Sequence, residues 1–289
     1  MPLENGCKKP DDCALKDCYD FLPRHHIFQL YRGGQKIVQL LNEGIHSLKD
    51  IPEDFKLTEK QKIQRECAIK KKAHVHKEKL KHFLRTLKYP LYFLDFETFS
   101  TAVPKFDWLK AWSQVPFQYS LHVVKKEGDK PGHFEFLYSK NGDPREEFIS
   151  ELRKVLGSRG SIVVYNQSFE INRLKELGEI FPSFKHDIEK FISRIVDLLI
   201  VFRDFMYYHP DQEGSASIKD VLPALTGKGY EGMAIGDGGT ASVKFYKMAY
   251  GNLNKEEKNK IYNDLLKYCG LDTMAEIMIL EKLKELIIK

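Results

Sequence analysis

Four acidic residues, at three separate points along the chain, have the types and spacing of a divided metal site. Asp95 and Glu97 lie in Leu-Asp-Phe-Glu-Thr, Glu170 ends Tyr-Asn-Gln-Ser-Phe-Glu, and Asp272 lies in Tyr-Cys-Gly-Leu-Asp-Thr. Side chains two apart on a strand point to the same face, so Asp95 and Glu97 would present their carboxylates together. Carboxylates suit Mg²⁺ or Mn²⁺, and two such ions about 4 Å apart can stabilise both reacting oxygens of a phosphodiester hydrolysis. The four acids therefore predict a two-metal site.

The surroundings of these acids differ in how strongly they favour metal binding. Asp95, Glu97 and Asp272 lie among apolar residues, where unpaired acids are unfavourable. Glu170 alone could equally be an exposed acid in a first helical turn, where it would interact well with the helix dipole. Asp197, in Arg-Ile-Val-Asp-Leu-Leu, is either a supporting acid of the site or the ion-pair partner of Arg194 or Arg203.

The apolar patterns around the acids predict an α/β fold with a mixed sheet. Three strands follow in quick succession, which favours an antiparallel meander, and the later segments alternate between helix and strand. The predicted strands are 91–96, 117–124, 133–138 and 161–165, with a short segment at 195–200. The predicted helices are 144–156 with Asp143 as its cap, 168–177, 217–225 and most of the C-terminal tail.

The first 88 residues differ from the rest in pattern and charge. Apolar periodicity predicts helices at 27–45 and 58–87, so we expect a helical arm of residues 1–88 ahead of a domain of residues 89–289. Residues 1–90 contain 19 Lys and Arg against 12 Asp and Glu, a net charge of +7, and the remainder contains 27 against 29, a net charge of −2. A basic arm could attract phosphate backbones, although a lysine-rich helical face is as often only solvated surface.

Composition and motifs exclude several classes of protein. Nothing approaches 18 uninterrupted apolar residues, the N-terminus lacks a signal-peptide core, and no GxxxxGK[ST] or HExxH motif occurs. We expect a cytoplasmic protein that does not contact membranes. The five cysteines do not indicate a secreted disulfide framework.

Cys7, Cys13 and Cys18 are spaced unlike standard zinc sites. They are either ordinary free thiols or ligands of Zn²⁺ or an iron–sulfur cluster, with a fourth ligand such as His25, His26 or Cys67.

From residue 88 onward the chain resembles the DEDD superfamily of 3′ to 5′ exonucleases, which have an RNase H-like fold. The segments at 94–98, 165–174 and 268–272 resemble its three motifs in the correct order. Tyr268, four residues before Asp272, resembles the tyrosine that marks one subclass. The segments Val-Pro-Phe-Gln-Tyr-Ser at 115–120 and Ser-Ile-Lys-Asp-Val-Leu-Pro-Ala-Leu at 217–225 are similar to an uncharacterised prokaryotic family within that superfamily.

The resemblance implies a role for each acid. Asp95 would bridge two Mg²⁺ or Mn²⁺ ions, Glu97 and Asp272 would complete the ligands of one, and Glu170 would serve the other directly or through water. Tyr268 would orient the attacking water, since its phenol suits hydrogen bonding better than proton removal. Glu170 departs from the usual aspartate, which puts its direct contact with metal in question. The implied sheet has five strands in mixed orientation with helices on its faces.

Four further residues are candidates for contact with nucleic acid: Thr98, Phe99, Phe117 and Asn166. Phe99 and Phe117 could stack on terminal bases, although core packing is the expected fate of at least one. Asn166 could bind substrate or a metal ligand, or simply form a turn. Trp108 and Trp112 could lie in the substrate cleft or on a partner surface.

The function we expect is hydrolysis of phosphodiester bonds at single-stranded DNA or RNA 3′ ends by a two-metal mechanism. One alternative is a nuclease-like module that binds nucleic acid and has weak or no catalytic activity. Another is that the cysteine-bearing arm is a platform for protein partners or a cluster, with the nuclease as its accessory.

Overall fold

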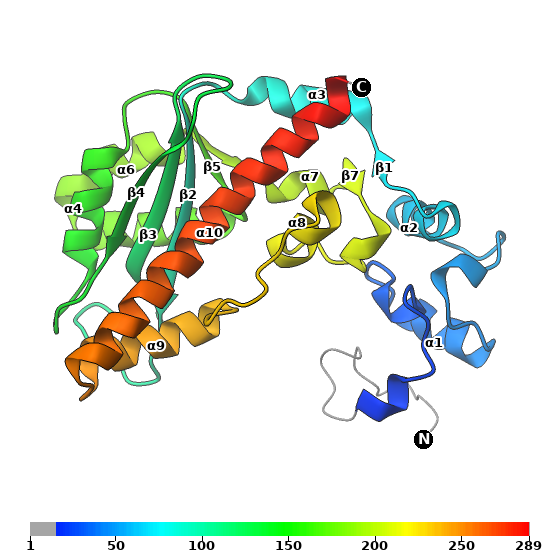
Figure 1. Ribbon diagram of the computed structural model, residues 1–289, viewed down its shortest axis with the longest axis horizontal. Helices are drawn as coiled ribbons and strands as arrows, with labels where there is room; N and C mark the ends of the chain where they lie inside the picture. Colours follow the sequence, from blue (N-terminus) through cyan, green and yellow to red (C-terminus); the bar gives the residue numbers. More distant parts are fainter. Residues whose placement is uncertain (1–15, 289) are drawn as a thin grey trace. The chain divides into compact units, whose positions relative to one another are not determined.

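A mixed five-stranded sheet organises the larger part of the computed structural model, which describes residues 16–288 (Figure 1). The strands are β2 (Leu91–Phe99), β3 (Val115–Val124), β4 (Gly132–Leu137), β5 (Ser161–Val164) and β6 (Ile195–Asp197), in the order β4-β3-β2-β5-β6. β2, β3 and β4 form the predicted antiparallel meander, and β5 runs parallel to both β2 and β6. The predicted α/β fold with a mixed sheet flanked by helices is confirmed.

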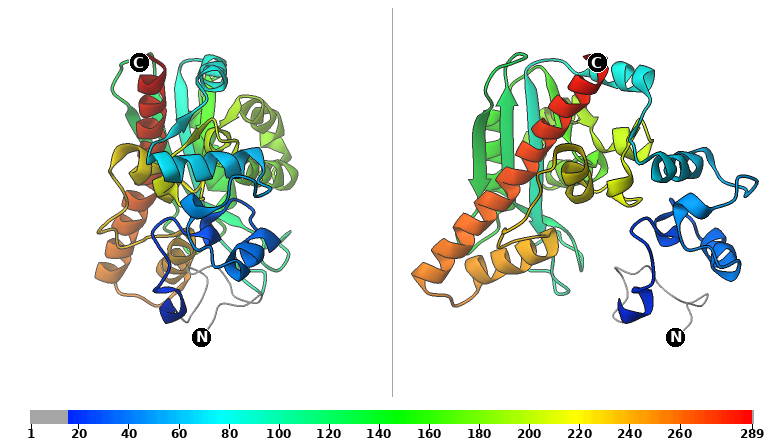
Figure 2. Two further views of the ribbon diagram at one scale, coloured as in Figure 1. Left: turned by 90° about the vertical axis from the view of Figure 1, so that its right-hand side faces the viewer. Right: turned by 45° about the vertical axis from the view of Figure 1, so that its right-hand side comes forward.

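Helices cover both faces of this sheet. On one face lie α4 (Arg145–Val155), α5 (Gln167–Ile180) and α6 (Lys185–Ile192), with η5 (Pro182–Phe184) between α5 and α6. On the other face lie α9 (Gly238–Tyr250) and α10 (Lys255–Ile288). The left view of Figure 2 shows the sheet between α10 in red and the yellow-green helices.

Alternation along β2 separates the apolar core from the acids. Tyr92, Leu94 and Phe96 belong to the buried cluster that contains residues of α4, α5 and α6. Asp95 and Glu97 therefore point to the opposite face. On that face, Asp95 pairs with Ser120 and Glu97 with Gln118 in the adjacent strand β3.

Hydrogen bonds fix α10 against β3. Gln118 Nε2 donates to the Leu265 carbonyl at 2.8 Å, and Ser120 Oγ lies 2.7 Å from Thr273 Oγ1. His122 Nδ1 lies 2.8 Å from the same Thr273 oxygen. α10 therefore has a defined position along the strand beside the one that carries Asp95 and Glu97.

The chain divides into two units. The second comprises His82–Leu199 and Lys228–Glu285. The first comprises residues up to Lys81 together with Ile200–Gly227 and the residues from Leu286 onward. The first boundary lies near the predicted one, but residues 200–227, which the sequence assigned to the domain 89–289, belong to the first unit. They do so because β1 (His74–Val75) pairs with β7 (Tyr207–Tyr208).

The remaining elements correct two predicted helices. Helix 27–45 is instead η3 (Ile27–Gln29) and α1 (Gln35–Asn42), separated by a turn in which Gly34 has φ of 49°. Helix 58–87 is interrupted: α2 (Glu59–Lys70) ends where Lys71 adopts the left-handed conformation, and β1 precedes α3 (Lys77–Thr86). The other elements are η2 (Lys16–Tyr19), η4 (Leu48–Asp50), α7 (Leu199–Arg203), η6 (Pro210–Gln212) and α8 (Ile218–Thr226). No helix among residues 16–288 is both long and apolar enough to cross a membrane.

Candidate metal centre

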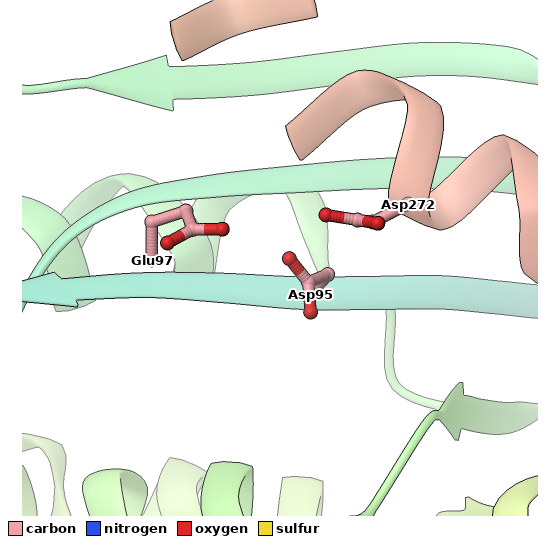
Figure 3. A group of neighbouring side chains, drawn as sticks. All are labelled: Asp95, Glu97 and Asp272. Carbon is pink, nitrogen blue, oxygen red and sulfur yellow. The ribbon is translucent and has the colours of Figure 1, made fainter. Parts of the chain in front are cut away.

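Three of the four predicted acids meet in the second unit. Asp95, Glu97 and Asp272 each offer a carboxylate oxygen, and these oxygens all lie within 4.8 Å of one another. Figure 3 shows Asp272 reaching from α10 toward the two acids of β2. Within the described part of the chain, no other group of three or more His, Cys, Asp or Glu side chains gathers its ligand atoms in this way.

The parallel strands explain why the acids lie at this edge of the sheet. Phe93 of β2 pairs with Val163 of β5, so Asp95 lies level with the point where β5 ends. Carboxyl ends of parallel strands meet at one edge of a sheet, where the loops that follow can build a site. Asn166 lies in the turn after β5, where it adopts the left-handed conformation with φ of 87°.

Asp197, the last residue of β6, supports this edge. It is buried, and its Oδ1 accepts hydrogen bonds from the backbone N–H groups of Asn166 and Leu199, each at 3.0 Å. No ion pair joins it to Arg194 or Arg203 in the described residues, and Arg194 instead donates to a backbone carbonyl. The alternative of an ion pair is therefore wrong. Asp197 holds the turn from which α5 begins.

Glu170 lies in the first turn of α5 and is only 2% exposed, so it is not a solvated helix-start acid. Its Oε2 has no hydrogen-bond partner. Burial raises the pKa of its carboxyl well above the usual value, and the charges of Asp95 and Asp197 raise it further. Glu170 thus lies close enough to Asp95 for the charge of Asp95 to raise its pKa, but it is not part of the group formed by Asp95, Glu97 and Asp272.

Glu276 is a fifth acid that the sequence reasoning missed. It lies on α10, is 1% exposed, and its Oε2 also lacks a partner. Burial raises the pKa of its carboxyl, as do the charges of Asp95, Glu170, Asp272 and Asp197 in decreasing order. The available signal was spacing: Glu276 follows Asp272 by four residues, so both lie on one face of the helix.

Two tyrosines lie beside the acids. Tyr268 is buried, and burial followed by the charges of Asp272 and Glu97 raises the pKa of its hydroxyl. Tyr230, in the segment between α8 and α9, donates a hydrogen bond of 2.6 Å to Asp272 Oδ1. Burial and the Asp272 carboxylate raise the pKa of Tyr230 as well. Both hydroxyls therefore stay protonated at neutral pH.

Cys269 lies next to Tyr268 and is fully buried. Its Sγ lies 3.5 Å from Asp95 Oδ2. Burial, with the nearby carboxylates, raises the pKa of its thiol, so it donates to Asp95 rather than competing for metal as a thiolate.

A cavity of about 360 Å³ opens next to Glu97. Its lining includes Thr98, Gln114, Phe169 and Gly238 at the start of α9. The Thr98 hydroxyl donates to Gln114 Oε1 at 2.6 Å. Of the residues predicted to contact substrate, Thr98 lines this cavity, whereas Asn166 is exposed in its turn and is not among the lining residues.

Phe99 and Phe117 are buried in the core between the sheet and α9 and α10, so neither ring is available to a base. Phe117 stacks on Phe245 with ring centroids 3.7 Å apart. The pairing register shifts after Glu97: Glu97 pairs with Gln118 and Thr98 with Pro116, so Phe117 is an extra residue of β3. Such a β-bulge changes the direction in which the side chain points.

Trp108 and Trp112, in the segment between β2 and β3, are 87% and 66% exposed. Both have positive φ, near 64° and 63°, which is uncommon for bulky residues.

The N-terminal cysteines do not form a site in the described residues. Cys7 and Cys13 lie outside them. Cys18 is a half-buried free thiol, and Cys67 is buried in the cluster with Phe205 and Tyr208. Burial raises the pKa of the Cys67 thiol to about 11, which disfavours the thiolate that a metal would need.

The comparisons with known proteins name no activity. Residues 92–217 match a family model described as "Domain of unknown function (DUF2779)", a segment that includes Asp95, Glu97 and Glu170 but not Asp272. Similar proteins are "Uncharacterized protein MG366" of Mycoplasma genitalium, at 29% identity over 73% of this chain and 34% of that protein, and "Uncharacterized protein UU173" of Ureaplasma parvum, at 25% identity over 70% and 32%. The chain thus spans about a third of the length of these relatives. No solved structure matches it.

Proposed function

We propose that the second unit is a two-metal 3′ to 5′ exonuclease with an RNase H-like fold, acting on single-stranded DNA or RNA ends. The observation that carries the proposal is the meeting of Asp95, Glu97 and Asp272 within 4.8 Å, with Glu170 buried close by. The strand order, with β2 at the centre and antiparallel to β3 but parallel to β5, supports the fold.

The donor set fits divalent cations. All its members are carboxylates, which suit Mg²⁺ and Mn²⁺, and the buried Glu170 Oε2 has no donor in the protein. A buried carboxylate without a partner is unfavourable, and a cation would compensate for it. Asp95, Glu97 and Asp272 would hold one ion, and Asp95 and Glu170 would hold a second. When bound, two such ions lower the pKa of a water and stabilise the charge on the leaving oxygen.

The chain's own groups then position the reactants. Tyr268, kept protonated by burial and the neighbouring carboxylates, donates a hydrogen bond that orients the attacking water. Tyr230 fixes the orientation of Asp272 through its 2.6 Å hydrogen bond. The cavity beside Glu97 falls at the lower end of the usual size range for ligand sites and would receive the terminal nucleotide.

The test uses 5′-labelled single-stranded and double-stranded DNA and RNA with Mg²⁺, Mn²⁺ or a chelator. We expect a ladder that shortens from the 3′ end and requires metal. Asp95→Asn and Asp272→Asn should reduce cleavage to background while keeping the fold, because each removes a ligand charge. The control is Glu281→Gln, which replaces an exposed acid on the same helix α10 and should cleave like the wild type.

Undiminished cleavage by either aspartate variant would refute the proposal. Tight oligonucleotide binding by the wild type without cleavage in any metal would favour the nucleic-acid-binding module instead.

A further inference from the structure

Glu276 lies where a carboxylate has no structural reason to be buried. It is 1% exposed, and its Oε2 contacts no hydrogen-bond donor. No ion pair in the described residues includes it. Burying an uncompensated carboxylate is strongly unfavourable, so the position requires either a bound proton or a cation.

Its neighbours come from three other elements and are themselves acidic. The charges that act on Glu276 belong to Asp95 of β2, Glu170 of α5, Asp197 of β6, and Asp272 one turn earlier on α10. Of these, Asp197 is already satisfied by two backbone N–H groups. Glu170 is not, since its Oε2 is buried without a partner in the same way. Two unpartnered carboxylates from different helices thus lie near Asp95.

We propose that Glu276 is a fifth metal-binding carboxylate, which joins Glu170 in holding the second divalent cation beside Asp95. This inference rests on the proposed two-metal function. It resolves the weakness of that second site, for which Asp95 and Glu170 alone supply few protein ligands, whereas the first site already has three acids within 4.8 Å of one another.

The alternative for Glu276 and Glu170 is a shared proton, which would make Glu276 a structural residue. The two interpretations differ in what a neutral amide at this position does. If a proton is shared, Glu276→Gln keeps both metal sites. If a cation is held, the same substitution removes a ligand charge and weakens only the second site.

The experiment measures Mn²⁺ binding to the full-length protein at neutral pH by calorimetry and by electron paramagnetic resonance, without substrate. We expect two Mn²⁺ ions per wild-type chain, with spin coupling from two ions about 4 Å apart. Glu276→Gln should weaken the second ion at least about tenfold and abolish the coupling, while the first ion still binds. The matched control is Glu281→Gln on α10, which should bind both ions like the wild type.

Two Mn²⁺ ions bound by Glu276→Gln with wild-type affinity would overturn the inference. Should Glu276→Gln not fold, as judged by circular dichroism, Glu276→Asp keeps the charge but shortens its reach, and unchanged affinity for the second ion in that variant would count equally against it. The proposed exonuclease function is tested independently of this metal site. If Glu276→Gln lost the second ion but the wild type cleaved no nucleic acid, the metal site would be supported and the exonuclease function rejected.

Discussion

At the scale of single residues, the acids of the site differ in how the protein satisfies them. Asp272 accepts a hydrogen bond from Tyr230, and Asp197 accepts two from backbone N–H groups. Glu170 and Glu276 each keep a buried oxygen without a donor. Hydrogen bonds within the fold therefore hold Asp272 and Asp197 in place. The positions of the Glu170 and Glu276 carboxylates instead depend on whether a proton or a cation binds to them.

Tyr230→Phe tests the positioning of Asp272. The substitution keeps the partly buried ring against the apolar cluster that it packs on, but removes the donor 2.6 Å from Asp272 Oδ1. Groups that orient a metal ligand typically contribute about 10- to 100-fold to metal affinity or activity. We expect the Mn²⁺ affinity of the first site and kcat to fall about tenfold, with little change in the free energy of unfolding.

The matched control for that variant is Tyr246→Phe on α9, whose ring contacts Phe99 and Tyr250 rather than the acids. Tyr246→Phe should leave the Mn²⁺ affinity of the first site and kcat unchanged. If Tyr230→Phe bound Mn²⁺ as tightly as the wild type, the hydrogen bond would have no part in orienting Asp272.

At the scale of elements, the docking of α10 on β3 sets the distance between Asp272 and the acids of β2. The central contact is Thr273, whose hydroxyl lies within hydrogen-bond distance of both Ser120 and His122. Ser120 pairs directly with Asp95 across the sheet. The hydroxyl network therefore connects α10, one residue away from Asp272, to β3, the strand that pairs with β2.

His122 makes this docking sensitive to pH. Burial, with the stacked ring of His133, lowers the pKa of His122 to about 4 from an ordinary value near 6.5. The folded state thus disfavours the protonated imidazole, and the unfolded state does not. The resulting loss of stability begins as pH falls through about 6.5 and is complete below about 4.

The prediction compares the wild type with His122→Gln, which can still hydrogen-bond to Thr273 but does not titrate. Relative to this variant, the free energy of unfolding of the wild type should fall by about 2 kcal/mol between pH 7 and pH 4. Urea unfolding at several pH values measures the difference, in which the titration of the carboxylates cancels. A difference that does not change with pH would mean that His122 titrates normally in the folded protein.

The elements also show which features the sequence could predict. Alternation along β2 correctly brought Asp95 and Glu97 to one face, because that pattern depends only on local geometry. The two-residue strand β1 was missed and replaced by a long helix, since its partner β7 lies more than 100 residues away and its segment carries helix-forming lysines. Tyr230 was missed for a related reason, because only tertiary packing brings its hydroxyl to Asp272. Glu276 was missed although its spacing of four residues from Asp272 on one helix was visible in the sequence.

At the scale of the whole molecule, the candidate site belongs to one unit. All of Asp95, Glu97, Glu170, Asp272 and Glu276 lie within His82–Leu199 and Lys228–Glu285. The excess positive charge belongs mainly to the first 90 residues, at a net +7. Metal binding and any attraction of phosphate by the basic segment are therefore properties of different parts of the chain and can be measured separately.

This division predicts how heat unfolds the full chain. Two units with separate cores can give two calorimetric transitions, and a ligand stabilises only the unit whose native state binds it. Mn²⁺ at about 100 times its Kd should stabilise the second unit by about 2.7 kcal/mol per site, which corresponds to a rise in Tm of several degrees for a unit of this size. The transition of the first unit should not move.

Asp95→Asn provides the control for this experiment, because it removes the acid common to both proposed metal positions. In that variant the second unit should have the same Tm with and without Mn²⁺. Its Tm without metal should exceed that of the wild type, since one of several repelling carboxylates is gone. Equal shifts of both transitions in the wild type, or an undiminished shift in Asp95→Asn, would indicate that Mn²⁺ stabilises the chain through other residues than these acids.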